Sequence, residues 1–124
     1  MDKAIQDAEK RLEILQRVQG FIDAANKIFE EQYKKNNYTF EDPPKLTIRN
    51  GKTSGDWIAL DKPRSVYCWI RMTDGSTKTL GTLRAGDIHR PATYRAPAKH
   101  ARGNVFEDDF GAHCAGPHGV QYLR

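Results

Sequence analysis

Cysteine is scarce in this sequence, and no long apolar run occurs in it. Only Cys68 and Cys114 are present among 124 residues, too few for a disulfide framework and typical of reduced thiols in the cytoplasm. No segment approaches the roughly 20 apolar residues of a membrane helix, and residues 1–20 alternate charged with apolar side chains, unlike a signal peptide. We therefore expect a cytoplasmic protein with no membrane partner.

Motifs of the common nucleotide-hydrolysing enzymes are also missing. The sequence holds no Walker-type loop, no Gly-x-Gly-x-x-Gly after a strand, no Gly-x-Ser-x-Gly and no His-Glu-x-x-His. Each of these patterns brings together groups that its chemistry needs, so their absence argues against those enzyme classes. We expect a protein that is not an enzyme and uses no cofactor.

The composition predicts one small domain. A chain of 124 residues is long enough for one domain and too short for two ordinary ones, so we assign 1–124 to a single unit. Hydrophobic residues make up 38% and charged residues 29%, which places the chain at the polar end of globular proteins, with a small core. A small core favours association into homo-oligomers.

A long amphipathic helix is predicted for residues 1–36, ending near Asn36-Asn37 because Pro43-Pro44 soon prevents a restart. Apolar side chains recur there at steps of three or four residues: Ile5, Ala8, Leu12, Leu15, Val18, Ile22, Ala25 and Phe29. The mean step of about 3.4 residues is close to the period of a seam between packed helices. At about 1.5 Å per residue the helix is longer than a domain of this size is wide, so we expect a second subunit to cover part of the stripe. In the alternative, the C-terminal part of the chain covers all of it.

Residues 44–124 predict a small antiparallel β-rich body, so the expected fold class is α+β. Short strands are expected at 46–48 and 57–60, joined through a turn at Asn50-Gly51. Beyond Arg84, frequent glycine and proline predict a loop-rich C-terminal segment with short strands only.

The most regular β pattern lies at 66–73. Its alternation places Tyr67, Trp69 and Arg71 on one face of a strand. Asp74-Gly75 is a turn signal that predicts a hairpin between this strand and residues 76–83.

Positive charge is concentrated in the body. Residues 1–42 carry 7 basic and 9 acidic side chains, whereas residues 43–124 carry 13 and 7. The densest basic stretch runs from Arg84 to Arg102. Such a stretch suits phosphate contacts, although a solvated basic surface would have the same composition.

The segment 94–104 contains the parts of a nucleotide pocket. Lys99 and Arg102 are donors suited to phosphate oxygens, and the small residues around them let the backbone approach a ligand. Tyr94 is suited to stacking on a base, and Asn104 to donating and accepting at a base or ribose edge. In the alternative, the segment is a structural turn in which Asn104 is left-handed and the basic residues pair with the acidic residues at 107–109.

Two other chemistries, acid–base catalysis and zinc binding, use residues of this segment or of other parts of the body. His89 and His100, with Lys99 or Arg102, are the residue types of an acid–base phosphodiesterase or ribonuclease. A zinc site could draw on His113, Cys114 and His118 with Cys68, but these ligands lack the usual paired spacing, so we expect no metal.

The run GDIHRPATYRAPAKHARGNVFEDDFG, followed by GPHGVQYLR, resembles small phage and prophage proteins of the Thoeris anti-defence sponge family over roughly residues 64–124. The resemblance implies N-terminal helices, a β-rich body and oligomers built from dimers. It also implies uncleaved binding of cyclic ADP-ribose-type immune signals at subunit interfaces, and in some members of cyclic oligonucleotides in a separate pocket. An aromatic residue and an asparagine ten positions later, implied as a ligand clamp, fall on Tyr94 and Asn104, and an implied strand arginine falls on Arg71. His118 stands where the family pattern has tyrosine.

The sequence therefore predicts a phage protein that sequesters a cyclic nucleotide signal in the cytoplasm of the infected host. Its expected ligand-binding residues are Arg71, Tyr94, Lys99, Arg102 and Asn104. The alternative is a protein that binds single-stranded nucleic acid or a host factor, with Tyr67, Trp69 and Tyr94 as stacking groups.

Overall fold

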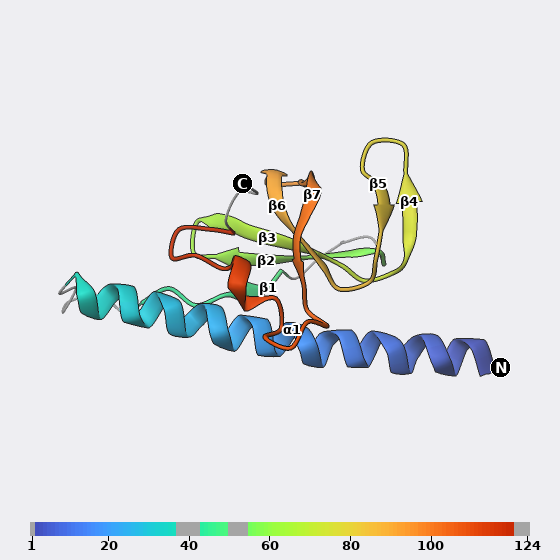
Figure 1. Ribbon diagram of the computed structural model, residues 1–124, viewed down its shortest axis with the longest axis horizontal. Helices are drawn as coiled ribbons and strands as arrows, with labels where there is room; N and C mark the ends of the chain where they lie inside the picture. The colour runs from blue at the N-terminus through green and yellow to red at the C-terminus, as the bar shows by residue number, and fades with distance from the viewer. Residues whose placement is uncertain (1, 37–42, 50–54, 121–124) are drawn as a thin grey trace.

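A computed structural model of the chain describes residues 2–36, 43–49 and 55–120 (Figure 1). One long helix lies along a small antiparallel sheet, which confirms the α+β fold class. The turn expected at Asn50-Gly51 lies outside the described residues. Within the described residues, no helix combines the length and the apolar character needed to cross a membrane.

The helix α1 spans Asp2–Lys35 and ends where the sequence predicts. Its side toward the sheet is buried from Ile14 onward. The buried side chains are the stripe members Val18, Ile22, Ala25 and Phe29, together with Ile14 and Phe21 beside them. Leu12, in contrast, is 58% exposed, and the N-terminal end of α1 extends past the sheet (Figure 1). The expectation that the chain covers its own stripe completely is therefore wrong. A second subunit as the cover stays a prediction.

Gly20 lies in the middle of α1 because an aromatic ring from the C-terminal segment occupies the space beside it. A Cβ atom on Gly20 would come within 2.5 Å of the Phe110 ring. The guanidinium of Arg17 lies 4.2 Å from the centroid of the same ring and donates to the backbone oxygens of Val105 and Glu107. The glycine thus allows the C-terminal segment to pack closely against the helix.

Five strands form the main sheet, and two form a separate ribbon. The sheet order is β1 (Thr47–Ile48), β2 (Trp57–Lys62), β3 (Ser65–Arg71), β6 (Asp87–Thr93) and β7 (Ala96–Asn104), with every pair antiparallel. The ribbon consists of β4 (Gly75–Thr77) and β5 (Gly81–Leu83), and a 3-10 helix η1 (Ala112–Cys114) follows β7.

The predicted hairpin at Asp74-Gly75 is wrong. β3 pairs with β2 and β6, while β4 and β5 pair only with each other. β3 is a central strand buried along most of its length, so it needs long partners on both edges, and the three-residue β4 is too short to be one. A local turn signal carries no information about this competition.

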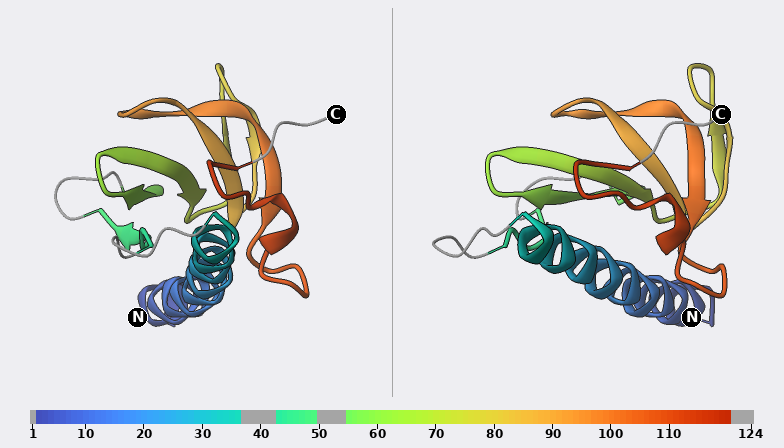
Figure 2. Two further views of the ribbon diagram at one scale, coloured as in Figure 1. Left: turned by 90° about the vertical axis from the view of Figure 1, so that its left-hand side faces the viewer. Right: turned by 60° about the vertical axis from the view of Figure 1, so that its left-hand side comes forward.

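The segment after Arg84 contains longer strands than the sequence predicts. β7 has nine residues and is the longest strand, although it contains Pro97. β7 lies at a sheet edge, and its pairing with β6 shifts register at three places, positions where proline is tolerated. The β6–β7 hairpin bends over β2 and β3 on the side away from α1 (Figure 2).

Tyr67 lies on the opposite side of the sheet from the one that the alternation predicts. The β2–β3 register shifts so that Leu60 faces Cys68 while Asp61 faces Val66, leaving Tyr67 as an extra residue in β3. This bulge turns its ring into the core, where it contacts Phe21 and Phe29. Tyr67 is 2% exposed and cannot serve as a stacking group for nucleic acid.

Candidate functional site

Two groups of aromatic, charged and polar residues lie on the sheet. The first group lies on the side of the sheet that faces away from α1, and this side is here called the aromatic–arginine face. Register partners share a face in an antiparallel pair, and two such pairs, Trp57 with Arg71 and Trp69 with His89, build its centre. Its members are Arg49, Trp57, Trp69, Arg71, His89 and Tyr94.

Arg49 connects this face to the tip of the β6–β7 hairpin. Its guanidinium lies 5.2 Å from the Trp69 ring centroid and 3.8 Å from that of Tyr94, and it donates to the Tyr94 carbonyl at 2.8 Å. Two further hydrogen bonds, at 2.8 and 2.7 Å, go to the carboxylate of Asp61. The hydrogen bonds that Arg49 donates to the Asp61 carboxylate raise the pKa of Arg49. Planar stacking and bidentate pairing are what arginine, but not lysine, provides.

Arg71 lies at the opposite end of the face and is 6% exposed. Its Nε donates to the Thr73 carbonyl at 2.7 Å, and its guanidinium lies 5.3 Å from the Trp57 ring centroid. Among the described residues no carboxylate lies within ion-pair distance of it. The face therefore carries a buried cationic group that makes no ion pair with a described acidic residue.

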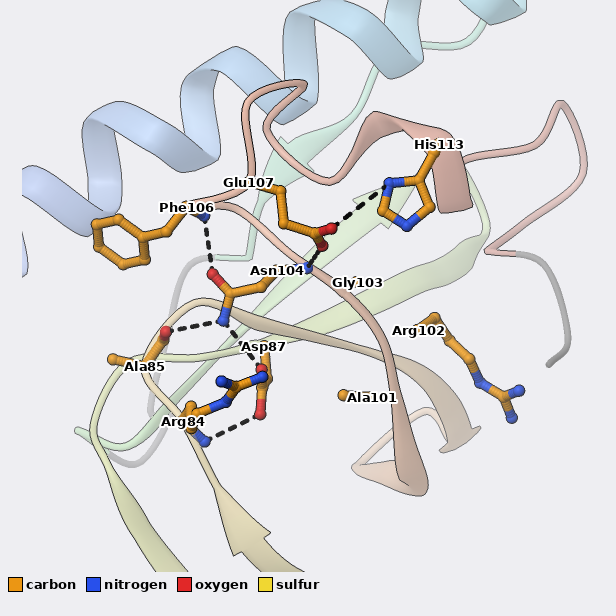
Figure 3. A pocket seen from close by; sticks show the side chains of 10 residues that line it. All are labelled: Arg84, Ala85, Asp87, Ala101, Arg102, Gly103, Asn104, Phe106, Glu107 and His113. Atoms are coloured by element: carbon orange, nitrogen blue, oxygen red, sulfur yellow. Dashed lines mark hydrogen bonds and ion pairs between the residues drawn. The ribbon is translucent and has the colours of Figure 1, made fainter.

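The second group lines a surface pocket of about 570 Å³ at the C-terminal end of β7 (Figure 3). Its walls consist of Arg84, Ala85, Asp87, Ala101, Arg102, Gly103, Asn104, Phe106, Glu107 and His113. This is the Asn104 pocket. Two arginines and two carboxylates line it, so it offers both donors and acceptors and is not a purely cationic site.

The Asn104 side chain holds the turn that forms one wall of this pocket (Figure 3). Its amide nitrogen donates to the Ala85 carbonyl at 3.1 Å and to Asp87 Oδ1 at 2.9 Å, and its oxygen accepts from the Phe106 amide at 2.8 Å. The side chain therefore has a structural role, but the segment is not the turn of the alternative prediction, because Ala96–Asn104 is the strand β7. The left-handed conformation that this alternative assumed is wrong, since Asn104 is not among the residues with positive φ.

The predicted site residues divide between the two groups. Arg71 and Tyr94 belong to the aromatic–arginine face, and Arg102 and Asn104 line the pocket. Lys99 is exposed on β7 between them. Tyr94 precedes β7 and Asn104 ends it, so within one chain this strand separates the two clamp residues.

Sequence reasoning missed two members of the face, Arg49 and Trp57. Charge density, the sequence signal for a cationic site, is highest between Arg84 and Arg102, whereas Arg49 lies outside that stretch, directly after a two-residue strand. Only the register of β2 against β3 brings Trp57 opposite Arg71. A pairing register is not visible in a single sequence.

The residues considered for a histidine phosphodiesterase and for a zinc site lie in different environments. His89 is buried and its pKa is lowered, chiefly by loss of hydration, while His100 is exposed on β7. Burial raises the pKa of the Cys114 thiol to about 12 and that of Cys68 well above its usual value, which disfavours the thiolates that zinc requires. Among the described residues, the three potential ligand atoms that lie within 4.8 Å of one another belong to Glu107, Asp109 and His113, and only His113 is a member of the set weighed from the sequence.

Residues 1–119 match a protein family described as a family of unknown function, DUF7717. The chain belongs to this family. The match includes α1, both groups of residues on the sheet and η1. No curated protein and no solved structure matches the chain.

Proposed function

We propose that the protein captures a nucleotide-type ligand between two copies of the chain and holds it without cleaving it. The sequence resemblance described above points to cyclic ADP-ribose-type immune signals, and to cyclic oligonucleotides as further ligands. In this role the protein is a phage anti-defence sponge that lowers the signal concentration in the cytoplasm of the host.

The observation that carries the proposal is the placement of the two clamp residues at opposite ends of β7. A nine-residue strand is about 30 Å long, so Tyr94 cannot reach the Asn104 pocket of its own chain. Tyr94 is 59% exposed at the hairpin tip, and the Asn104 pocket opens on the surface. A clamp made from these two positions therefore needs the tip of one copy against the pocket of another.

Such a composite site supplies the contacts that a nucleotide ligand needs. The Tyr94 ring, already contacted by Arg49, offers its exposed surface to a base. Arg84 and Arg102 are positioned along the pocket to bind phosphate oxygens, and Glu107 to accept from ribose hydroxyls. Lys99, exposed on β7, adds positive charge near the incoming ligand.

A mixing experiment tests the composite site directly. Tyr94→Ala removes the tip contribution and Arg102→Ala the pocket contribution, and each variant alone should lose binding of cyclic ADP-ribose isomers in calorimetry. When both variants are co-expressed, a mixed pair of chains holds one site with both changes and one site with neither. Binding should therefore return in the co-expressed sample, and Lys78→Ala, an exposed change in the β4–β5 ribbon, should have no effect throughout.

A site contained within one chain would give a different result. Each copy would then carry one defective residue in its own site, and co-expression would restore nothing. Full binding by both single variants would show that neither Tyr94 nor Arg102 contributes to the ligand site. Asn104 is not used as the pocket variant because loss of its three hydrogen bonds would also disturb the turn.

The second candidate is a single-stranded nucleic-acid binder. It is favoured by the run of exposed residues along the hairpin, where Tyr94, Arg95, Lys99 and His100 could follow a backbone. The two functions differ in their response to salt. A groove that neutralises several phosphates loses affinity by orders of magnitude between about 50 and 200 mM salt, whereas a small enclosed ligand loses much less.

A further inference from the structure

Two buried polar atoms on the aromatic–arginine face lack hydrogen-bond partners. Trp69 is 6% exposed and His89 is fully buried, yet neither Trp69 Nε1 nor His89 Nε2 has a partner among the described residues. Buried donors and acceptors are nearly always paired in folded proteins, because an unpaired one loses its hydration without compensation. Two such atoms on cross-strand partners therefore point to a binding partner on this face of the sheet.

The chemical roles of the two atoms are opposite and fixed. The indole nitrogen of Trp69 is only a donor. His89 Nδ1 lies 2.7 Å from the Ala98 carbonyl, which can only accept, so Nδ1 carries the proton. Burial lowers the pKa of His89 and keeps its ring neutral, which leaves Nε2 as an acceptor. Trp69 and His89 are cross-strand partners, so the side chains that carry the donor and the acceptor share one face of the sheet.

We propose that Trp69 Nε1 and His89 Nε2 form a binding subsite for the edge of a nucleobase that presents an acceptor beside a donor. The 6-amino group of adenine would donate to His89 Nε2, and the neighbouring ring nitrogen would accept from Trp69 Nε1. This subsite is distinct from the composite site at the Asn104 pocket and does not depend on it.

The rest of the face suits a nucleotide at this position. The Trp57 ring is set edge-on to His89, with centroids 5.2 Å apart, and provides an apolar wall beside the subsite. Arg71, at the other side of Trp57, brings a guanidinium that makes no ion pair with a described carboxylate. The ribose phosphate of a bound nucleotide is the complementary group.

Access to the subsite runs beneath the hairpin tip. The β6–β7 ladder shifts register at three places between Ile88 and Thr93, so the hairpin has few regular pairs to stiffen it. Arg49 fastens the tip to β1 through the Tyr94 carbonyl. Binding of a flat ring at the subsite requires the tip to move away from the face, which breaks this hydrogen bond and the contact between Arg49 and the Tyr94 ring.

Substitutions that remove one nitrogen at a time test the subsite. Trp69→Phe removes the donor and keeps an aromatic ring. His89→Asn keeps a donor to the Ala98 carbonyl but removes the acceptor at the Nε2 position, whereas His89→Gln places an amide oxygen there. The probes are adenosine 5′-monophosphate and purine riboside 5′-monophosphate, which lacks the 6-amino group, measured by calorimetry on the full chain.

The expected result is binding of the adenine nucleotide with a loss of about tenfold in Trp69→Phe and in His89→Asn. His89→Gln should stay within about threefold of the unsubstituted protein, and purine riboside monophosphate should bind it about tenfold more weakly than the adenine nucleotide. Equal affinity for both nucleotides, unchanged affinity in both deleting variants, or no binding of the adenine nucleotide would overturn the proposal. The last result would show that the pair binds no adenine nucleotide. Thermal unfolding of each variant verifies that a lost signal reflects the site and not the fold.

Discussion

Arg49 and Tyr94 are joined twice, through a hydrogen bond to the Tyr94 carbonyl at 2.8 Å and through a guanidinium that lies 3.8 Å from the centroid of its ring. The same guanidinium is anchored to Asp61 on β2. This contact fixes the exposed tyrosine at the hairpin tip while leaving one surface of its ring to a partner. The position of the tip, and with it both proposed sites, depends on one arginine near the opposite edge of the sheet.

Arg49→Ala should release the hairpin tip without unfolding the protein. The side chain loses a hydrogen bond, two stacking contacts and its pairing with Asp61, which together should lower the free energy of unfolding by about 1–3 kcal/mol. Amide hydrogen exchange within Thr93–Ala96 should accelerate more than exchange in β3. Arg95→Ala, an exposed change beside Tyr94, is the matched control. Equal exchange at the tip in all three proteins would show that Arg49 does not hold it.

Gly20→Ala should destabilise the protein even though alanine favours helices. The added methyl group overlaps the Phe110 ring, and overpacking of this kind costs about 1–3 kcal/mol against a gain in helix propensity of about 1 kcal/mol. In a Phe110→Ala background the overlap disappears, and the same change should stabilise by about 0.5–1 kcal/mol. Denaturant unfolding of the four proteins measures both effects. The same sign of change in the two backgrounds would show that Phe110 is not the cause.

Protonation of His89 should weaken the fold at acid pH. Burial lowers the pKa of His89 in the folded state, so the unfolded chain binds the proton more readily. The stability that depends on the neutral ring is complete above the unfolded value of about 6.5 and is lost as the pH falls through the folded pKa. The free energy of unfolding measured from pH 7.5 to 5 should fall more steeply in the unsubstituted protein than in His89→Gln. Parallel curves would contradict this assignment.

Leu12 is the side chain with which to test association through α1. It is 58% exposed on the part of the predicted stripe that the sheet leaves uncovered. If a second copy covers it, Leu12→Glu places a charge in that interface and should shift the protein toward smaller species in sedimentation or light scattering. Glu13→Gln, at the neighbouring exposed position, should not. An unchanged assembly state in Leu12→Glu would exclude this part of α1 from the interface.

The sequence predicted those features that depend on local chemistry. The period of apolar residues and Asn36 with the prolines beyond it located α1 and its end, and the β character of 57–60 and 66–73 was correct. The features it missed depend on pairing between distant strands. The bulge that turns Tyr67 into the core, the exclusion of β4 from the sheet and the meeting of Arg49 with Trp69 are all set by register.

The residues of the candidate site could be predicted, but their arrangement could not. The sequence identified Tyr94, Arg102 and Asn104 as polar or aromatic groups near a basic stretch, and the structure places the last two at one pocket. The sequence could not show that β7 is a continuous strand that keeps Tyr94 away from that pocket. Nor could the sequence show that the Asn104 amide makes three hydrogen bonds inside the protein, since two of them go to Ala85 and Asp87, which are distant in the sequence.

Native mass spectrometry tests the central claim most directly. The purified protein is incubated with cyclic ADP-ribose isomers, and the number of chains, the bound mass and the released ligand are measured together. Capture between copies predicts an oligomer that retains the ligand, at no more than one molecule per composite site, and releases it chemically intact. Ligand bound to a single chain, a cleaved product, or no retained ligand at any concentration would contradict the account.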